Sequence, residues 1–252
     1  MAGRGEKHKR TASETPVQFR PASRYGARVN TGDPSRQNPV PGLPRLPPGR
    51  HGLSRDFVVQ NQRGRLSAGI IAAVAERGYN KTTVSHIAVA AGVSRRTFYA
   101  YFSSKEDCYL ETYGVIGSHL AEASRSAGAG HDEWPTRVRA KLAAALEFFA
   151  GNPDLVRFYL SAPPRAGEEI AARYRLGATR VLADLTDGMP AKVREPSQAV
   201  QSALAGGMAA LIVGKVEAGE GDRLEELLPD LAELFLTPYI GREAAIHVAR
   251  LP

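Results

Sequence analysis

The residues with the clearest chemical capacity in this sequence lie together in the segment Arg95–Tyr101. Arginine can make two parallel hydrogen bonds to guanine, and threonine can bond to a base edge or contact a thymine methyl group. Tyrosine hydroxyls suit phosphate oxygens. In a helix these polar side chains would lie opposite Phe98 and Phe102; they are Arg95, Arg96, Thr97, Tyr99 and Tyr101. The segment predicts a helix that reads DNA, and a solvated basic face on an ordinary helical hairpin is the alternative.

Capping residues and a glycine define the elements around this segment. Thr83 can cap a short helix over Val84–Ala90, and Ser94 can cap a second one over Arg95–Tyr101, because an N-cap hydroxyl accepts a backbone N–H of the first turn. Gly92 lies where a sharp turn between two helices needs a permissive backbone. Two short helices joined in this way form a helix-turn-helix, whose second helix lies in the major groove.

Longer helices are predicted on both sides of this pair. Ser54 can cap the first and Gly78 can end it. Its apolar positions recur at helical spacing: Leu66, Ile70, Ile71 and Val74. After the pair, Ser103 and Glu106 have the spacing of a capping box. Lys105 would then lie at a helix N-terminus, where a lysine suits a phosphate oxygen.

Charge is distributed unevenly along the 252 residues. The net charge of +7 divides into +7 for residues 1–54, +6 for residues 55–105 and −6 for residues 106–252. A basic end followed by an acidic body indicates that one end faces nucleic acid.

Residues 1–53 are predicted to form a disordered basic tail. The first 54 residues hold eight of the 17 prolines, and their apolar residues show no period. Such a segment buries too little surface to offset its ordering entropy. Its charge serves either solubility or non-specific attraction to phosphate. Close to the folded part, four basic side chains could reach a DNA groove as a flexible arm: Arg45, Arg50, His51 and Arg55.

Other functional classes find no support in the residues. The single cysteine, Cys108, excludes a disulfide framework and a cysteine-cluster metal site. No continuous apolar run approaches the length of a membrane helix, so no membrane partner is expected. Phosphate loops, zinc-protease and serine-hydrolase motifs are absent. We therefore expect a cytoplasmic protein that is not an enzyme and has no catalytic residue, metal or cofactor.

The remainder of the chain also indicates helices and no strand. Apolar residues recur at helical spacing in five stretches, roughly 138–149, 153–159, 170–185, 196–218 and 222–237, and a short amphipathic piece is expected over 242–251. Pro163-Pro164 and Pro238 are predicted to end helices, and Pro229 to break or restart one. A loop is predicted over Ser126–His131. The fold class is therefore all-α.

A set of short segments at fixed spacing resembles a known family. They are Gly78-Tyr79, Thr82-Thr83-Val84, Ile87-Ala88, Ala90-Ala91-Gly92-Val93-Ser94, Thr97-Phe98-Tyr99, Tyr101-Phe102 and Ser104-Lys105-Glu106. Together they resemble the N-terminal DNA-binding domain of the TetR/AcrR transcriptional regulators, without gaps over about 55–112. The position of Arg96 is a departure, because the family often has glycine or proline there.

After the tail at 1–53, the resemblance implies two parts: a three-helix DNA-binding domain at 54–112 and a helical effector-binding and dimerisation domain at 113–252. It implies that the polar face of the second short helix meets DNA, with Thr83 and Ser85 near the backbone. With the arm and the cap included, the predicted DNA-binding residues are Arg55, Thr83, Ser85, Ser94, Arg95, Arg96, Thr97, Tyr99, Tyr101 and Lys105.

In the body the resemblance is one of layout only. It implies that helices 196–218 and 222–237 pair with those of a second subunit; packing within one chain is the alternative. The candidate interface residues are Leu204, Met208, Leu211, Leu227, Leu231 and Leu234. An effector pocket is expected among the helices of 113–190, although aromatic residues at this spacing are more often core. Its candidate residues are Trp134, Phe148, Phe149, Phe158, Tyr159, Tyr174 and Met189.

The sequence thus predicts a homodimeric repressor that binds a palindromic operator in double-stranded DNA and responds to a small-molecule effector. Two alternatives remain open. One is an architectural protein that binds DNA without regard to sequence. The other is a helical ligand-binding or partner-binding protein that does not recognise DNA.

Overall fold

The structure is a computed structural model that describes residues 55–251, with side chains from Val58 onward. The predicted tail of residues 1–53, with its arm residues Arg45, Arg50 and His51, lies outside the described residues, as does the side chain of Arg55. Every regular element in the described part is helical, which confirms the all-α prediction.

Three helices form the N-terminal part: α1 (Arg55–Arg77), α2 (Val84–Ala91) and α3 (Arg95–Tyr101). They meet around fully buried apolar side chains contributed by all three helices, namely Leu66, Ile70, Ile87 and Phe98. The predicted cap of α2 is confirmed, since Thr83 Oγ1 accepts the N–H of His86 and the His86 ring accepts the N–H of Thr83. Gly92 has a φ of 61°, the left-handed conformation that its turn requires.

The helix α4 (Lys105–Gly128) begins one residue later than the predicted capping box implies. Ser104, not Ser103, is the N-cap: its Oγ accepts the N–H of Asp107 at 3.0 Å. Asp107 in turn accepts the N–H and the hydroxyl of Ser103 at 2.8 and 2.9 Å. A carboxylate that accepts two hydrogen bonds at the positive end of a helix explains why Asp107, rather than Glu106, completes the cap.

The other end of α4 extends into the predicted loop over Ser126–His131. The helix continues to Gly128, where a Cβ atom would lie 2.7 Å from Lys141 Cε. The missing side chain lets α4 approach α5 (Trp134–Phe149) closely. This interhelical contact favours helix at residues whose composition indicates a loop.

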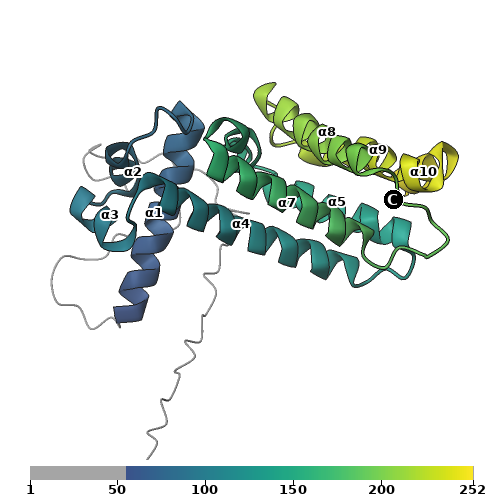
Figure 1. Cartoon of the computed structure of the whole chain (residues 1–252), viewed down its shortest axis with the longest axis horizontal. Coiled ribbons are helices and arrows are strands. Elements are labelled where there is room, and N and C mark those ends of the chain that lie inside the picture. The colour runs from purple at the N-terminus through teal and green to yellow at the C-terminus, as the bar shows by residue number, and fades with distance from the viewer. Residues whose placement is uncertain (1–54, 252) are drawn as a thin grey trace, which may run out of the picture.

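The body is a stack of helices in which α4, α5 and α7 run side by side and α8, α9 and α10 lie over them (Figure 1). Short π and 3₁₀ segments connect these helices. The elements after α5 are α6 (Pro153–Val156), the π turn η2 (Arg157–Ser161), η3 (Pro163–Arg165), α7 (Glu168–Thr186), α8 (Gln198–Glu217), η4 (Leu224–Leu227), α9 (Leu228–Ile240) and α10 (Arg242–Ala249). The predicted restart at Pro229 is confirmed, because η4 ends and α9 begins there.

Pro238 does not end α9, as the sequence predicts, but lies inside its last turn. The helix continues to Ile240 and is closed by Gly241, whose N–H donates to the carbonyl of Thr237 at 3.0 Å and whose φ is 82°. Tyr239 and Ala245, on either side of this closure, are buried. Packing of α10 against α9 thus holds a helical turn that a proline would weaken.

Among residues 55–251, α8 is long and apolar enough to cross a membrane, with a mean hydropathy of 1.5. One such helix is weak evidence for a span, and in this fold Leu204, Met208, Ile212 and Val216 on one side of it are buried against the rest of the chain.

The contact between α1 and α2 depends on Gly69. A Cβ atom at this position would lie 2.8 Å from the Cβ and the backbone N of Ala91, closer than side chains approach one another. We expect Gly69→Ala to lower the free energy of unfolding by about 1–3 kcal/mol, because overpacking outweighs the gain in helix propensity. Urea denaturation measures the change.

Gly114→Ala on α4 is the matched control for this substitution. Its Cβ would lie at an ordinary 3.5 Å from Arg173 Nη2, so the helix propensity of alanine should raise stability by up to about 1 kcal/mol. Equal effects of the two substitutions would contradict a tight contact at Gly69.

Candidate functional site

The predicted polar face of α3 lies in solvent. Arg95, Arg96 and Tyr99 are exposed, with 52% of Tyr99 accessible, while Thr97 and Tyr101 are half-buried. Phe98 and Phe102 face the interior, and both are almost fully buried. A short helix with an aromatic inner face and a basic, hydroxyl-bearing outer face can present that outer face to a rigid, negatively charged partner.

The N-termini of α2 and α3 are closed by hydroxyl groups. Ser94 Oγ accepts the N–H of Thr97 at 3.0 Å, and the two hydroxyl oxygens are 2.9 Å apart. At α2, Thr83 and Ser85 are both exposed, and Thr83 is engaged in the capping box. These helix N-termini carry partial positive charge, which suits phosphate oxygens.

Arg65 of α1 holds the turn between α2 and α3. Its side chain is 3% exposed, and Nη2 donates to the carbonyls of Ala91 and Gly92 at 2.7 and 2.8 Å. These carbonyls lie at the C-terminal end of α2, where cations are favoured and acceptors lack partners within the helix. The sequence did not identify Arg65, because a basic residue on a predicted helix is expected at the surface. Its burial depends on the turn between α2 and α3, which lies far along the chain.

Lys105 makes internal contacts at the start of α4. Its Nζ donates to the carbonyls of Tyr79 and Thr82 at 2.8 and 3.0 Å and lies 4.0 Å from the centroid of the Tyr79 ring. Burial lowers the pKa of its ammonium group from the ordinary value, whereas Glu106 acts to raise it. Two of the three ammonium donors are thus used to bind α4 to the α1–α2 loop, and one remains for the predicted phosphate contact.

The same α1–α2 loop contacts the body at two points. Tyr79 packs edge-on against Tyr109 of α4, with ring centroids 5.0 Å apart, and the Tyr109 hydroxyl donates to the carbonyl of Phe158 in η2 at 2.7 Å. Asn80 Nδ2 donates to the carbonyl of Arg165 in η3 at 3.0 Å. The short helices and the body are therefore joined by directional contacts as well as by the continuous α4.

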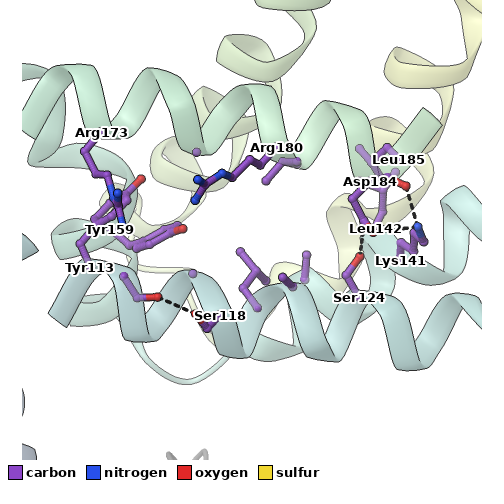
Figure 2. Close-up of a pocket in the computed structure, with 17 residues that line it drawn as sticks. Tyr113, Ser118, Ser124, Lys141, Leu142, Tyr159, Arg173, Arg180, Asp184 and Leu185 are labelled. Carbon is purple, nitrogen blue, oxygen red and sulfur yellow. Dashed lines mark hydrogen bonds and ion pairs between the residues drawn. The ribbon is translucent and has the colours of Figure 1, made fainter. Parts of the chain in front are cut away.

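A cavity of about 260 Å³ lies between α4, α5 and α7 (Figure 2). Glycines leave room for it on two of these helices: Gly114 and Gly117 on α4, and Gly177 on α7. A Cβ atom at Gly117 would lie 2.9 Å from the Tyr159 hydroxyl. The apolar residues that line it are Leu120, Ala121, Leu142, Ala145, Val181 and Leu185.

Two tyrosines and two arginines form one end of the cavity. The rings of Tyr113 and Tyr159 are stacked with centroids 4.2 Å apart. Figure 2 shows Arg173 and Arg180 extending from α7 toward these rings. Burial raises the pKa of both phenols, and the two arginines act in the opposite direction on Tyr159. Both hydroxyls therefore remain protonated at neutral pH.

A lysine and an aspartate form the other end. Lys141 is 5% exposed, and its Nζ contacts Asp184 at the backbone carbonyl (2.6 Å) and at Oδ1 (3.0 Å). The Ser124 hydroxyl donates to Asp184 Oδ2 at 2.6 Å. The charges at this end thus compensate each other (Figure 2).

Of the seven aromatic and sulfur-containing residues predicted to line a pocket, Tyr159 lies in the cavity wall. The other six lie elsewhere, because their side chains fill the interior or the helix junctions. Trp134, for example, donates its indole N–H to the carbonyl of Leu185 at 2.9 Å and packs against Tyr239. Those outside the wall are Trp134, Phe148, Phe149, Phe158, Tyr174 and Met189. Glycine spacing on α4 was the available sequence signal for the cavity.

The residues predicted for a dimer interface divide into two groups. Leu204, Met208 and Leu231 are buried within the single chain, because α8, η4 and α9 pack on one another. Leu227 and Leu234 are half-buried, and Leu211 is 40% exposed.

Cys108 is fully buried at the start of α4, and burial raises the pKa of its thiol far above the ordinary value. This environment suits a small apolar side chain and disfavours a reactive thiolate. Within residues 55–251, no group of His, Cys, Asp and Glu side chains is arranged to hold a metal ion.

We expect Arg65→Met to lower the free energy of unfolding by about 1.5–3 kcal/mol, because it removes charge-assisted hydrogen bonds to two carbonyls. Arg96→Met is the control; its side chain is exposed, and a change within about 0.5 kcal/mol is expected. Thermal or urea denaturation measures both. Similar stabilities for the two variants would contradict the role of Arg65 in the turn.

Comparison with known proteins places these features in context. Residues 68–112 match the model of the bacterial regulatory proteins of the tetR family. A search of curated proteins gives no match. The match spans the end of α1, both short helices and the start of α4, which are the elements that carry the exposed basic face.

Solved structures share most of the described fold. The fatty acid degradation regulator FadR from Bacillus halodurans is 17% identical, with a TM-score of 0.60 over 69% of this chain and 93% of that one. FadR from Bacillus subtilis, solved in complex with stearoyl-CoA, is 18% identical, with a TM-score of 0.58 over 69% and 96%. The regulator PfmR from Thermus thermophilus is 20% identical, with a TM-score of 0.54 over 71% and 96%.

The likeness to these structures extends beyond the short helices to the helical body, and identities of this level establish the shared fold alone. The match at residues 68–112 identifies the helix-turn-helix itself. On these findings, residues 68–112 carry a DNA-binding segment of the tetR-family type, and the helical body shares its fold with solved regulators of that family.

Proposed function

We propose that this protein is a DNA-binding transcriptional repressor, active as a homodimer, whose affinity for DNA is changed by a small molecule in the α4–α5–α7 cavity. The observation that carries the proposal is the exposed basic face of α3, held by buried aromatic side chains and by the Arg65 contacts to the turn.

Recognition by α3 would follow the usual geometry of a helix-turn-helix, with the second helix in the major groove. Arg95 and Arg96 begin this helix and are exposed, so each can reach a base edge or a phosphate. Thr83 and Ser85 lie at the start of α2, which crosses the DNA backbone in this arrangement. The net charge of +6 over residues 55–105 would add affinity that decreases as salt concentration rises.

The outer side of α8 supports dimerisation. Val200 and Leu211 are 39% and 40% exposed there, and a Cβ atom at Gly206 or Gly214 would meet nothing within 4 Å. Small residues let two helix backbones approach closely, and an exposed apolar helix face gains free energy when it is covered. We propose that this face pairs with the same face of a second chain, with Leu211 at the contact. A two-fold dimer presents its recognition helices about one DNA turn apart, which is why a palindromic operator is expected.

The cavity would connect ligand binding to DNA binding through α4. Tyr113 in the cavity wall and Tyr109, which contacts both Tyr79 and Phe158, are one helical turn apart on that helix. Movement at the cavity therefore acts on the residues that hold the α1–α2 loop. A ligand that binds one arrangement of these helices better than another shifts the population toward it. The similar regulator from Bacillus subtilis, solved with stearoyl-CoA, shows that the fold accommodates a ligand in that protein.

We expect the full-length protein to select a defined operator from a random DNA library and to bind it more tightly than random DNA at the same salt concentration. Arg95→Ala and Arg96→Ala should each weaken operator binding by about 1–3 kcal/mol if the side chain contacts a base, with relaxed preference at particular base pairs. Fluorescence anisotropy measures the affinities.

Arg125→Ala provides the control for the two substitutions. This arginine is exposed near the C-terminal end of α4 and pairs with its neighbour Glu122 on the same helix. Its replacement should leave operator binding unchanged. Equal loss of affinity for operator and random DNA in the Arg95 and Arg96 variants would instead favour the sequence-tolerant architectural alternative.

For the dimer, we expect the wild-type protein to sediment at twice the chain mass of 27.1 kDa and Leu211→Glu to shift it toward the monomer, because a carboxylate in an apolar interface is costly. Leu176→Glu, at a leucine of α7 with 44% exposure, is the matched control. Analytical ultracentrifugation gives the result. An unchanged dimer in the Leu211 variant would place the interface elsewhere.

A further inference from the structure

The charges that line the cavity do not balance. Its wall contains Arg173, Arg180 and Lys141 but a single carboxylate, that of Asp184. Lys141 and Ser124 already occupy both oxygens of this carboxylate at one end of the cavity. The two arginines at the other end are therefore left without a compensating acid in the wall.

The position of these arginines on α7 directs both toward one place. They are seven residues apart, about two helical turns, so they lie on the same side of the helix. Gly177 lies between them on that side, and Figure 2 shows both arginine side chains extending toward the tyrosine rings. Arg173 and Arg180 are both exposed, and among the described residues neither forms an ion pair, whereas Arg175 on the same helix is paired with Glu168.

The tyrosines add a hydrogen-bond donor at this place. Figure 2 shows the Tyr159 side chain beside Arg173 and Arg180, and burial raises the pKa of its phenol, so the hydroxyl keeps its proton. The Tyr159 O–H can therefore donate to an acceptor at this place. Two guanidinium groups and one phenol O–H therefore lie around one position, where an anionic group would accept hydrogen bonds from them.

The remainder of the cavity is apolar. Leu120, Leu142, Val181 and Leu185 line the space between the tyrosine end and the Lys141–Asp184 end. At about 260 Å³ it falls just below the roughly 300–1,000 Å³ common for sites of drug-sized ligands, so its occupant is small. A single ring or a short acyl chain has suitable size and chemistry.

We infer that the cavity binds a small organic anion, with its anionic group between Arg173, Arg180 and the Tyr159 hydroxyl and its apolar part directed toward Leu142 and Leu185. The regulatory meaning of this site rests on the proposed function, but binding itself does not. A free carboxylate joins an apolar part directly to an anionic group, whereas in a coenzyme A thioester the pantetheine arm separates the acyl chain from the phosphates. In the thioester, the phosphates would meet the arginines at the cavity opening.

Isothermal titration calorimetry on the full-length protein, without DNA, tests the inference with benzoate, octanoate, octanoyl-CoA and the neutral octanamide. We expect at least one of the anions to bind, and octanamide to bind at least tenfold more weakly than that anion. Octanoate or benzoate binding indicates a free carboxylate, while binding of octanoyl-CoA alone indicates the thioester. Failure of all three anions to bind, or equal binding of octanamide, would overturn the inference.

Substitutions then test which residues hold the anion. Arg173→Gln and Arg180→Gln should each weaken binding of the anion about tenfold or more, and the double substitution should remove the preference over octanamide. Arg175→Gln, on the same helix but outside the cavity wall, is the matched control and should bind as the wild type does. Unchanged affinity in both the Arg173 and Arg180 variants, with the fold verified by circular dichroism, would also overturn it.

Operator binding measured with and without the anion separates this inference from the proposed function. An anion that binds without changing the affinity for operator leaves the anion site standing and contradicts the ligand-responsive regulator. Specific operator binding by a protein that binds none of the anions contradicts the anion site and leaves the DNA-binding proposal standing.

Discussion

A helix of seven residues does not persist in water by itself, and this constraint governs the N-terminal part of the molecule. The helix α3 (Arg95–Tyr101) makes few backbone hydrogen bonds of its own, so its position depends on tertiary contacts. Phe98 and Phe102 anchor it in the core. Arg65 binds the carbonyls at the turn before it, and Gly69 lets α1 lie against the helix that precedes the turn. The exposed basic face is a consequence of this buried support.

The long helix α4 connects the contacts that support α3 to the helical body. Lys105, Tyr109 and Tyr113 follow one another at intervals of four residues, so they lie along one side of the helix. Lys105 binds the α1–α2 loop, Tyr109 contacts both that loop and the π turn η2, and Tyr113 forms part of the cavity wall. One rigid element therefore touches both the support of α3 and the proposed ligand site. Through α4, the cavity and the DNA-facing helix can take part in the same conformational equilibrium, as coupling between two sites requires.

The cavity combines two kinds of polar environment. At the Lys141–Asp184 end, a buried charge is matched by its partner and by the Ser124 hydroxyl, as buried ions require. At the tyrosine end, two guanidinium groups lie at the opening, where water can solvate them when the site is empty. An ordinary structural ion pair explains the first end but not the second. Positive charge alone does not indicate an external anion. The indication comes from the two arginines, which have no acidic partner in the cavity wall, whereas Lys141 has one.

The features that the sequence determined by itself are local ones. Thr83, Gly92 and Ser94 set the ends of α2 and α3 because a cap or a left-handed glycine interacts with residues only two to four positions away. The match to the tetR-family model over residues 68–112 follows from the same short-range pattern.

Tertiary structure decided what depends on residues distant in the sequence. In the folded chain the cap of α4 is Ser104 and α9 continues past Pro238, both unlike the prediction. Arg65 also lies under a turn 26 residues further along the chain. The tertiary structure also put Tyr159 in the cavity wall while burying Trp134 and Phe158 elsewhere. The spacing of aromatic residues shows which side of a helix is apolar, but a cavity forms where facing helices lack side chains. That absence becomes visible only when α4, α5 and α7 are packed together.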